Sequence, residues 1–139
     1  MEVKKPESPE EFAAYYDLRW RILRRPWDQP RGSEKDELED DSDHIMVLND
    51  EKNIVGAGRL HLNSETEGQI RFMAVEENQQ GSGVGTMVIR ELERIAKTHG
   101  CDEIILNARD TAVKFYKKHR YQVLRPGHHL FGKVAHFKM

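Results

Sequence analysis

Three glycines stand close together between an apolar segment and an amphipathic one. The run Gln80-Gly81-Ser82-Gly83-Val84-Gly85-Thr86 follows an apolar segment that ends at Val75, and apolar residues at helical spacing come after it. Glycine allows a tight turn and a close approach of backbone to ligand. The N–H groups at a helix start, with the positive end of the helix dipole, favour an anion. The run therefore predicts an anion site that suits a pyrophosphate.

Two common phosphate-binding patterns fit this run poorly. A Walker A loop ends in Gly-Lys-Ser/Thr, whereas Gly85 is followed by Thr86 and Met87. A dinucleotide fingerprint that begins at Gly81 would need glycine at position 86. The run alone leaves two other interpretations open. One is a loop that merely turns a strand into a helix, and the other is a different kind of nucleotide-binding domain.

Two motifs in this order and spacing resemble the GNAT N-acetyltransferases. Residues 80–85 resemble motif A, Gln/Arg-x-x-Gly-x-Gly/Ala, within a segment like the family's fourth strand, phosphate loop and following helix. The later run ARDTAVKFYKKHRYQVL resembles motif B, with Ala112, Phe115, Tyr116 and Tyr121 at matching positions and Arg120 in place of a glycine. The resemblance covers about residues 44–125. It implies one GNAT-like α/β domain over residues 1–139, with a mixed central sheet, helices on both faces, and splayed fourth and fifth strands.

The resemblance implies an acyltransferase that moves an acetyl group from acetyl-CoA to a primary amine by direct attack on the thioester, without a metal. Backbone N–H groups of residues 81–86 would hold the pyrophosphate, and the backbone of residues 73–75 would pair with the pantetheine arm. Arg109 stands where the family often has asparagine, and it would serve as a charge-assisted donor. The positions assigned to the coenzyme are Met73, Ala74, Val75, Gln80, Gly81, Ser82, Gly83, Val84, Gly85, Thr86, Asn107, Arg109 and Phe115.

Tyr116 aligns with the family tyrosine that lies near the coenzyme sulfur, and the resemblance implies that it is the general acid. A phenol with an ordinary pKa of about 10 is matched to a thiolate leaving group. The base position, a glutamate in the best-known relatives, is occupied by Gln69. A water chain that ends on Glu67, His44 or His61 is the expected substitute. The missing glutamate also keeps open an alternative function, a non-catalytic acyl-CoA sensor or regulatory module.

The acceptor is expected to be a small-molecule or peptide amine. An acidic stretch, residues 34–43, lies where relatives often wall the acceptor site, and its charges would attract a cationic amine. A solvated loop is the alternative interpretation. Trp20, Arg24 and Trp27 either line the same wall or pack the first helix.

Helices and strands must position these residues. Ser8, Pro9 and Glu11 form a capping-box start for a helix that runs to about Arg25. Gly56 and Gly58 within a strand indicate a bulge or a close backbone approach. The remaining predictions are strands at 3–5, 44–48, 54–62, 69–75, 103–106, 121–124 and 133–137, and helices at 33–38, 83–99 and 110–119. Buried stripes are expected at Phe12, Tyr15, Tyr16, Ile22 and Leu23, and at Val84, Met87, Val88, Leu92, Ile95 and Ala96.

Composition narrows the functional class. A length of 139 residues suits one domain, and 37% apolar with 33% charged residues is typical of a globular protein. A net charge of −2 predicts no general attraction to nucleic acid or to anionic membranes.

Cys101 is the single cysteine, so no internal disulfide forms. Without a signal peptide or an apolar span, the expected location is the cytoplasm. The adjacent His128 and His129, expected in a loop, are a poor basis for a zinc site. Homodimers are common in the family, so oligomeric state stays open.

Overall fold

The computed structural model describes residues 1–130 and 134–138. The chain divides into two compact units, Met1–Ile104 and Ile105–Met139, which we describe separately. Within the described residues, no helix is both long enough and apolar enough to cross a lipid bilayer.

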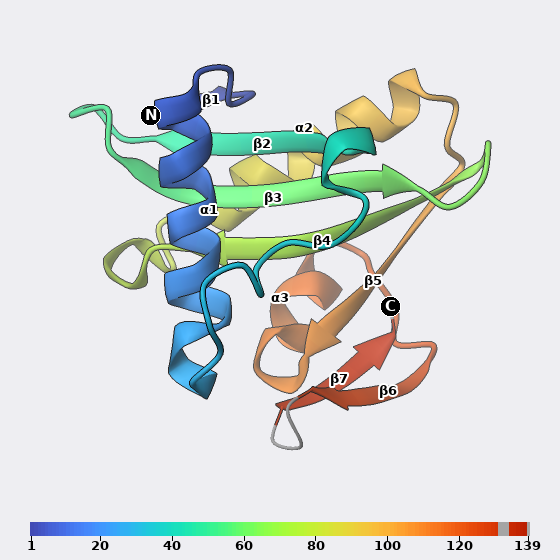
Figure 1. Cartoon of the computed structure of the whole chain (residues 1–139). Helices are drawn as coiled ribbons and strands as arrows, with labels where there is room; N and C mark the ends of the chain where they lie inside the picture. Colours follow the sequence, from blue (N-terminus) through green and yellow to red (C-terminus); the bar gives the residue numbers. More distant parts are fainter. Residues whose placement is uncertain (131–133, 139) are drawn as a thin grey trace. The chain divides into compact units, whose positions relative to one another are not determined.

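The first unit is an antiparallel sheet covered by two helices. The strands pair in the order β1-β2-β3-β4. In Figure 1, α1 crosses one face of β2, β3 and β4, and α2 lies behind the same strands. The elements are β1 (Glu2–Lys4), α1 (Pro9–Leu23), a 3-10 turn (Arg25–Trp27), a second 3-10 turn (Glu39–Asp41), β2 (Asp43–Leu48), β3 (Ile54–Leu62), β4 (Glu67–Val75), a third 3-10 turn (Glu77–Gln79) and α2 (Val84–Thr98).

Helix α1 begins as its sequence predicts. The Ser8 hydroxyl accepts from the Glu11 N–H at 3.1 Å, and the Glu11 carboxylate accepts from the Ser8 N–H, which completes the capping box. The helix ends at Leu23, two residues earlier than expected, and a 3-10 turn follows. Its most buried side chains are Tyr15, Leu18 and Arg19. Arg19, absent from the predicted stripe, is fully buried.

The predicted helix over residues 33–38 is wrong. The segment forms turns, and its own carboxylates take the backbone donors that a helix would use. Asp36 Oδ1 accepts from the Leu38 N–H at 2.9 Å, and Glu39 Oε2 accepts from the Asp36 N–H at 3.0 Å. Such local side-chain bonds compete with helix formation, and here only the 3-10 turn at residues 39–41 remains.

Two glycines of β3 let helix α2 lie close to the sheet. A Cβ on Gly56 would stand 2.5 Å from Val84 Cγ1, and a Cβ on Gly58 would stand 2.5 Å from Val88 Cγ1. Real Cβ contacts are longer, so the predicted close approach is confirmed. The predicted stripe of α2 is buried except for Met87, which is only half-buried, and Ile89, which the prediction left out, is buried as well. The start of α2 is thus fixed directly over β3.

Strand β4 carries a bulge near its middle. The pairing with β3 shifts register between Ala57 and Arg59, and opposite that shift Phe72 adopts a positive φ of 56°. A non-glycine residue rarely adopts this left-handed backbone. The bulge turns Arg71 and Phe72 to the same side of the sheet, because Arg71 contacts the α1–β2 segment and the Phe72 ring contacts Arg19 of α1.

The second unit is a smaller three-stranded arrangement. Its strands pair antiparallel in the order β5-β7-β6. The elements are β5 (Glu103–Arg109), a 3-10 turn (Asp110–Ala112), α3 (Val113–Lys118), β6 (Arg125–Leu130) and β7 (Val134–Lys138).

Several predictions for this part of the chain are corrected. Strand β5 extends to Arg109, so Asn107 and Arg109 lie within the strand and not after it. A 3-10 turn precedes α3, and Asp110 accepts from the N–H of Thr111 without capping the α-helix. Residues 121–124 are not a strand, because the Tyr121 N–H bonds back to Tyr116 O and still closes the helix end. Residues 128 and 129 lie in β6. Position 133 of the last predicted strand falls outside the described residues.

Candidate active site

The glycine-rich loop joins β4 to α2 and exposes its backbone. Gly81 and Gly83 have φ values of 84° and 92°, a conformation that side chains disfavour, and a Cβ on either would meet no atom within 4 Å. The i→i−4 ladder of α2 starts with Met87 N–H donating to Gly83 O. The N–H groups of Val84 and Gly85 therefore precede the ladder and lie at the positive end of the helix dipole. This loop has the open space and the donors that an anion requires.

The other positions of the first unit that were predicted to contact the coenzyme differ in exposure. Gln80, Gly81, Ser82 and Gly83 are exposed, while Val84 is fully buried against β3 and anchors the loop. Ser82 Oγ donates to Gln79 O at 2.5 Å, and Gln80 Nε2 donates to Val75 O at 3.3 Å. On β4, Ala74 packs in the core beside α1, and Met73 and Val75 are half-buried. Gly85 and Thr86 are also half-buried.

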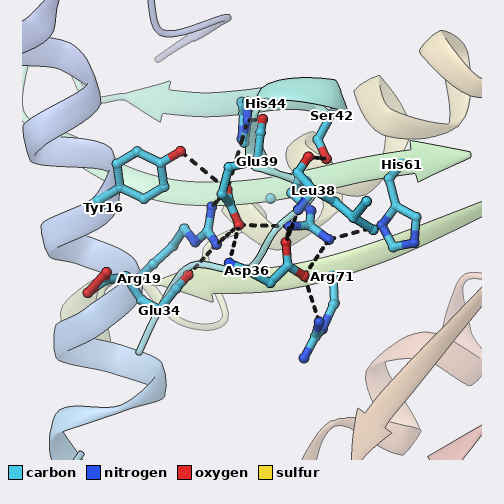
Figure 2. A network of polar contacts seen from close by, with 12 residues as sticks. Tyr16, Arg19, Glu34, Asp36, Leu38, Glu39, Ser42, His44, His61 and Arg71 are labelled. Atoms are coloured by element: carbon cyan, nitrogen blue, oxygen red, sulfur yellow. Dashed lines mark hydrogen bonds and ion pairs between the residues drawn. The ribbon is translucent and has the colours of Figure 1, made fainter. Parts of the chain in front are cut away.

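On the α1 side of the sheet, arginines and carboxylates form a network (Figure 2), which we call the arginine cluster. Glu39 accepts from Arg19 at 2.8 Å and from Arg59 at 2.7 Å. Asp36 accepts from Arg59 at 2.5 Å and from Arg71 at 2.8 Å. Arg19 and Arg59 are fully buried, so these contacts act in a poorly solvated environment. The arginine cluster, Arg19, Asp36, Glu39, Arg59 and Arg71, ties the α1–β2 segment to β3 and β4.

The charges of this cluster shift the pKa of its carboxyl groups. Burial alone would raise the pKa of Asp36, but the hydrogen bond from Arg59 and the charges of Arg59 and Arg71 outweigh burial and hold it well below its usual range. For Glu39, burial likewise opposes contacts with Arg19 and Arg59, and the net pKa is lowered. Both side chains are therefore carboxylates at neutral pH, and arginines neutralise their charge.

The acidic stretch thus has a different role from the one its composition suggests. Asp36 and Glu39 are occupied by arginines, and the Glu34 carboxylate accepts from the Gly32 N–H at 2.8 Å. Asp43 pairs with His99 at 2.9 Å. Internal contacts therefore hold the segment, which weakens the expectation of a free negative wall for a cationic amine.

Trp20, Arg24 and Trp27 lie at the other end of the same segment. Trp20 Nε1 donates to Gln29 O at 3.0 Å, and Arg24 Nε donates to Ser33 O at 2.9 Å. Trp27 is half-buried in the 3-10 turn that follows α1. These contacts favour the packing interpretation for Trp20 and Arg24, since both bind backbone of the loop.

The two histidines proposed as proton acceptors are both held by hydrogen bonds. Arg59 can only donate, so its 3.0 Å contact makes His61 Nδ1 an acceptor and places the proton on Nε2, which donates to Asn63 Oδ1 at 3.1 Å. His44 Nε2 donates to Glu39 O at 2.8 Å, and its Nδ1 lies 2.9 Å from the Tyr15 hydroxyl. Burial lowers the pKa of both imidazoles, which favours their neutral forms. This arrangement favours structural roles.

Glu67 and Gln69 share one partner at the start of β4. Asn63 Nδ2 donates to Glu67 Oε1 at 2.9 Å and to Gln69 Oε1 at 3.0 Å. Both side chains are half-buried and alternate with Gly68, so they lie on the face that also carries Arg71. A carboxylate therefore stands beside the glutamine that occupies the family's base position.

In the second unit, Tyr116 is the buried aromatic of α3. It is 7% exposed, whereas its neighbour Phe115 is half-buried. Burial raises the pKa of Tyr116, while the charge of Arg109 opposes that rise. Burial lowers the pKa of Arg109, which is half-buried, and Asn107 is exposed. Arg120, at the family's glycine position, adopts a positive φ of 72° after the helix.

The residues that sequence reasoning missed are Arg19, Arg59, Asn63 and Arg71. Arg59 stands inside the strand Ile54 to Leu62, which is apolar apart from Arg59 and His61, and a charged residue at such a position was a usable signal. Arg19 had the same signal within the buried stripe of α1. Within the part of the chain that the structure describes, no group of three or more His, Cys, Asp or Glu side chains is arranged to hold a metal ion.

Comparison with known proteins assigns the family. The sequence model of the acetyltransferase (GNAT) family matches residues 12–121, so the chain belongs to this family and is an acyltransferase. It is 34% identical over 133 residues to the uncharacterized N-acetyltransferase YjcF of Bacillus subtilis, covering 96% of this chain and 94% of that relative.

Solved structures confirm the expected fold class. A crystal structure of aminoglycoside 6'-N-acetyltransferase complexed with coenzyme A is similar with a TM-score of 0.81 at 14% identity, covering 100% of this chain and 95% of the other. An acyl-CoA N-acyltransferase from Pseudomonas aeruginosa has a TM-score of 0.81 at 19% identity, covering 99% and 95%. At these identities the likeness shows the acyl-CoA N-acyltransferase fold alone.

Proposed function

We propose that this protein transfers an acetyl group from acetyl-CoA to a primary amine. The observation that carries the proposal is the loop between β4 and α2, where two positive-φ glycines leave open space at a helix N-terminus. Family membership supports it, and so does the relative of the same fold that was crystallised with coenzyme A. The donor supplies the thioester whose carbonyl carbon the amine attacks, so that a C–N bond forms while the C–S bond breaks.

The loop backbone fits the role of pyrophosphate site. N–H groups of Gly81, Gly83, Val84 and Gly85 would donate to phosphate oxygens, whereas the Ser82 N–H already donates to Gln79 O. These main-chain donors need no particular side chain. The backbone of Met73, Ala74 and Val75 would pair with the pantetheine arm as an added strand. In the second unit, Asn107, Arg109 and Phe115 are the further residues proposed to contact the coenzyme.

For proton transfer to the leaving group we propose Tyr116. Its raised pKa means that the phenol keeps its proton at neutral pH. The proton is therefore present when the thiolate departs, which is what a general acid must ensure. The nearby charge of Arg109 limits the rise and makes the phenol a better acid than burial alone would.

For proton transfer from the amine we propose Glu67. An alkyl amine with a pKa near 10.4 is charged at neutral pH, and removing its proton costs roughly 4.6 kcal/mol at pH 7. Of the three candidates, His44 and His61 use both ring nitrogens in hydrogen bonds. Glu67 accepts from Asn63 through Oε1, and its Oε2 is the oxygen that would accept the proton. Gln69 would then position Asn63 and leave proton acceptance to Glu67.

The experiment is to measure coenzyme thiol release from acetyl-CoA with a panel of amines. Tyr116→Phe removes only the hydroxyl, so turnover should fall by about 10²–10⁴-fold while coenzyme affinity changes little. Tyr121→Phe, which alters the ring 5.9 Å away, is the matched control and should retain most turnover. Full activity in Tyr116→Phe would refute the general-acid role. Coenzyme binding without thiol release for any amine would instead indicate a non-catalytic acyl-CoA sensor.

A further inference from the structure

Four guanidinium groups surround the ring of Phe72, the bulge residue of β4. The side chain is 7% exposed, so these cations gather at a nearly buried aromatic face. Their central carbons lie 4.0 Å (Arg19), 4.6 Å (Arg71), 4.9 Å (Arg59) and 5.5 Å (Arg24) from the ring centroid. The positive φ of Phe72 places its ring among them.

The arginine cluster has more donors than acceptors. Three guanidinium groups, those of Arg19, Arg59 and Arg71, share the two carboxylates of Asp36 and Glu39. One positive charge is therefore in excess among these five side chains. Consistent with this, the Nε atoms of Arg19 and Arg59 are buried and have no acceptor among the described residues. An anion that contacts an exposed member of the cluster would be attracted by this excess positive charge.

Arg71 is the member of the cluster that an external molecule can reach. Its side chain is 43% exposed, whereas Arg19 and Arg59 are fully buried. Among the described residues it donates one hydrogen bond, from Nη1 to Asp36 Oδ2. Asp36 holds the guanidinium in place, and the planar fork keeps further N–H groups that match the geometry of a carboxylate or phosphate.

Arg71 is also placed where an acceptor would lie if the proposed function holds. It follows Gln69 and Glu67 on the same face of β4, and it precedes Met73, where the proposed backbone contacts with the coenzyme begin. Alternate residues of a strand are about 6.6 Å apart. Gln69 lies between Glu67 and Arg71, so the Cα atoms of these two residues are about 13 Å apart along the strand. The side chains of Glu67 and Arg71 and the length of the acceptor would together span this distance.

We propose that the acceptor is an amine that also carries an anionic group, a carboxylate or a phosphate, and that Arg71 is the residue that selects it. This inference rests on the proposed function and names its substrate class. It replaces the expectation of a cationic amine held by the acidic stretch, because two of its carboxylates, Asp36 and Glu39, are neutralised by the cluster.

The test compares three amines of matched length, which are ethanolamine, β-alanine and O-phosphoethanolamine, in the thiol-release reaction. At least one anionic amine should exceed ethanolamine in kcat/KM in the wild type. In Arg71→Gln, kcat/KM for that amine should fall by roughly 10- to 100-fold, mainly through KM, because one charge-assisted contact is lost. Arg71→Lys keeps the charge and should recover part of the loss. Arg94→Gln, an equally charged and 61% exposed change on α2, should alter none of the three.

These outcomes distinguish a failure of the proposed anion site at Arg71 from a failure of the proposed acetyl transfer. An equal loss for all three amines, or a wild-type preference for ethanolamine, would overturn the inference and leave acetyl transfer intact. If no amine releases coenzyme thiol, the proposed function is wrong. The anion site is then tested by the melting temperature of the protein with and without each anionic amine. A rise with O-phosphoethanolamine or β-alanine in the wild type and not in Arg71→Gln supports the anion site, and no rise overturns it.

Discussion

The two faces of the sheet in the first unit are built in opposite ways. On the face toward α2, Gly56 and Gly58 remove side chains so that the helix lies close, and the loop before α2 presents bare backbone. On the face toward α1, long charged side chains meet across gaps of 20 or more residues in sequence, as Arg19 and Glu39 do. The first face depends on side chains being absent, and the second depends on particular side chains being present.

This difference implies different sensitivities. A backbone-built anion site tolerates most changes in neighbouring side chains but not the filling of its open space. A network of buried charges tolerates little, because removing one partner leaves the others desolvated and unpaired. Substitutions on the α2 face should therefore do harm by filling open space, whereas substitutions on the α1 face should do harm by leaving buried charges unpaired.

The largest expected effect is in the arginine cluster. Glu39→Gln leaves the buried Arg19 and Arg59 without a shared carboxylate, so the free energy of unfolding at pH 7 should fall by about 3–5 kcal/mol. Chemical denaturation measures this directly. Glu37→Gln, an exposed change in the same segment, is the control and should stay within about 0.5 kcal/mol.

The same carboxylate predicts a pH dependence. The pKa of Glu39 is lowered in the folded protein, so its stabilisation is present above the unfolded value of about 4.3 and is lost as pH falls below it. The stability difference between wild type and Glu39→Gln should narrow as pH falls through that range. A difference that stays constant down to pH 3 would contradict the ion-pair origin of the effect.

A smaller effect is expected at the glycine-built face. In Gly58→Ala the new Cβ would stand 2.5 Å from Val88 Cγ1 and 2.9 Å from Met73 Sδ, so α2 must shift. Overpacking of this kind costs about 1–3 kcal/mol in unfolding free energy. Adding Val88→Ala removes the clashing methyl group, and the double variant should be more stable than the two single changes predict by addition. Strict additivity would show that the close approach at Gly58 is not what limits this position.

Local signals made much of the fold predictable. The capping box at Ser8, Pro9 and Glu11 involves only residues within one helical turn. The glycines of β3 predicted that another element approaches the strand closely, but they did not predict that this element is α2. The conformation of the glycine-rich loop was predictable for the same reason, since it depends only on glycines and a helix start. Family resemblance then indicated coenzyme A as the expected ligand.

The arginine cluster was not predictable, because its partners come from α1, β3, β4 and the intervening segment. Arg59 and Asp36 are 23 positions apart, and nothing in either local sequence indicates the pairing. The bulge at Phe72 also lacks a sequence marker, because a phenylalanine there adopts a backbone that usually favours glycine. The helix predicted at residues 33–38 is wrong because the carboxylates of Asp36 and Glu39 accept hydrogen bonds from nearby backbone N–H groups.

The smallest expected effect is at Gln69. If Glu67 accepts the proton, Gln69→Ala removes one of two contacts to Asn63 and should lower kcat by less than about tenfold. Steady-state rates with saturating acetyl-CoA and the best amine provide the measurement. A loss of several orders of magnitude in a folded variant would show that Gln69 itself takes part in the chemistry.

The most direct test of the account is the affinity of coenzyme A for two glycine variants, measured by calorimetry. Gly83→Val and Gly100→Val place the same side chain at positive φ, 92° and 85°, at opposite ends of α2, and neither meets an atom within 4 Å. That clearance is for the Cβ alone, and the positive φ is the feature that the two positions share, so both should lose similar stability from backbone strain. The account predicts that Gly83→Val weakens coenzyme A binding at least tenfold, about 1.4 kcal/mol, while Gly100→Val binds like the wild type. Unchanged affinity in a folded Gly83→Val protein would contradict the assignment of this loop as the pyrophosphate site.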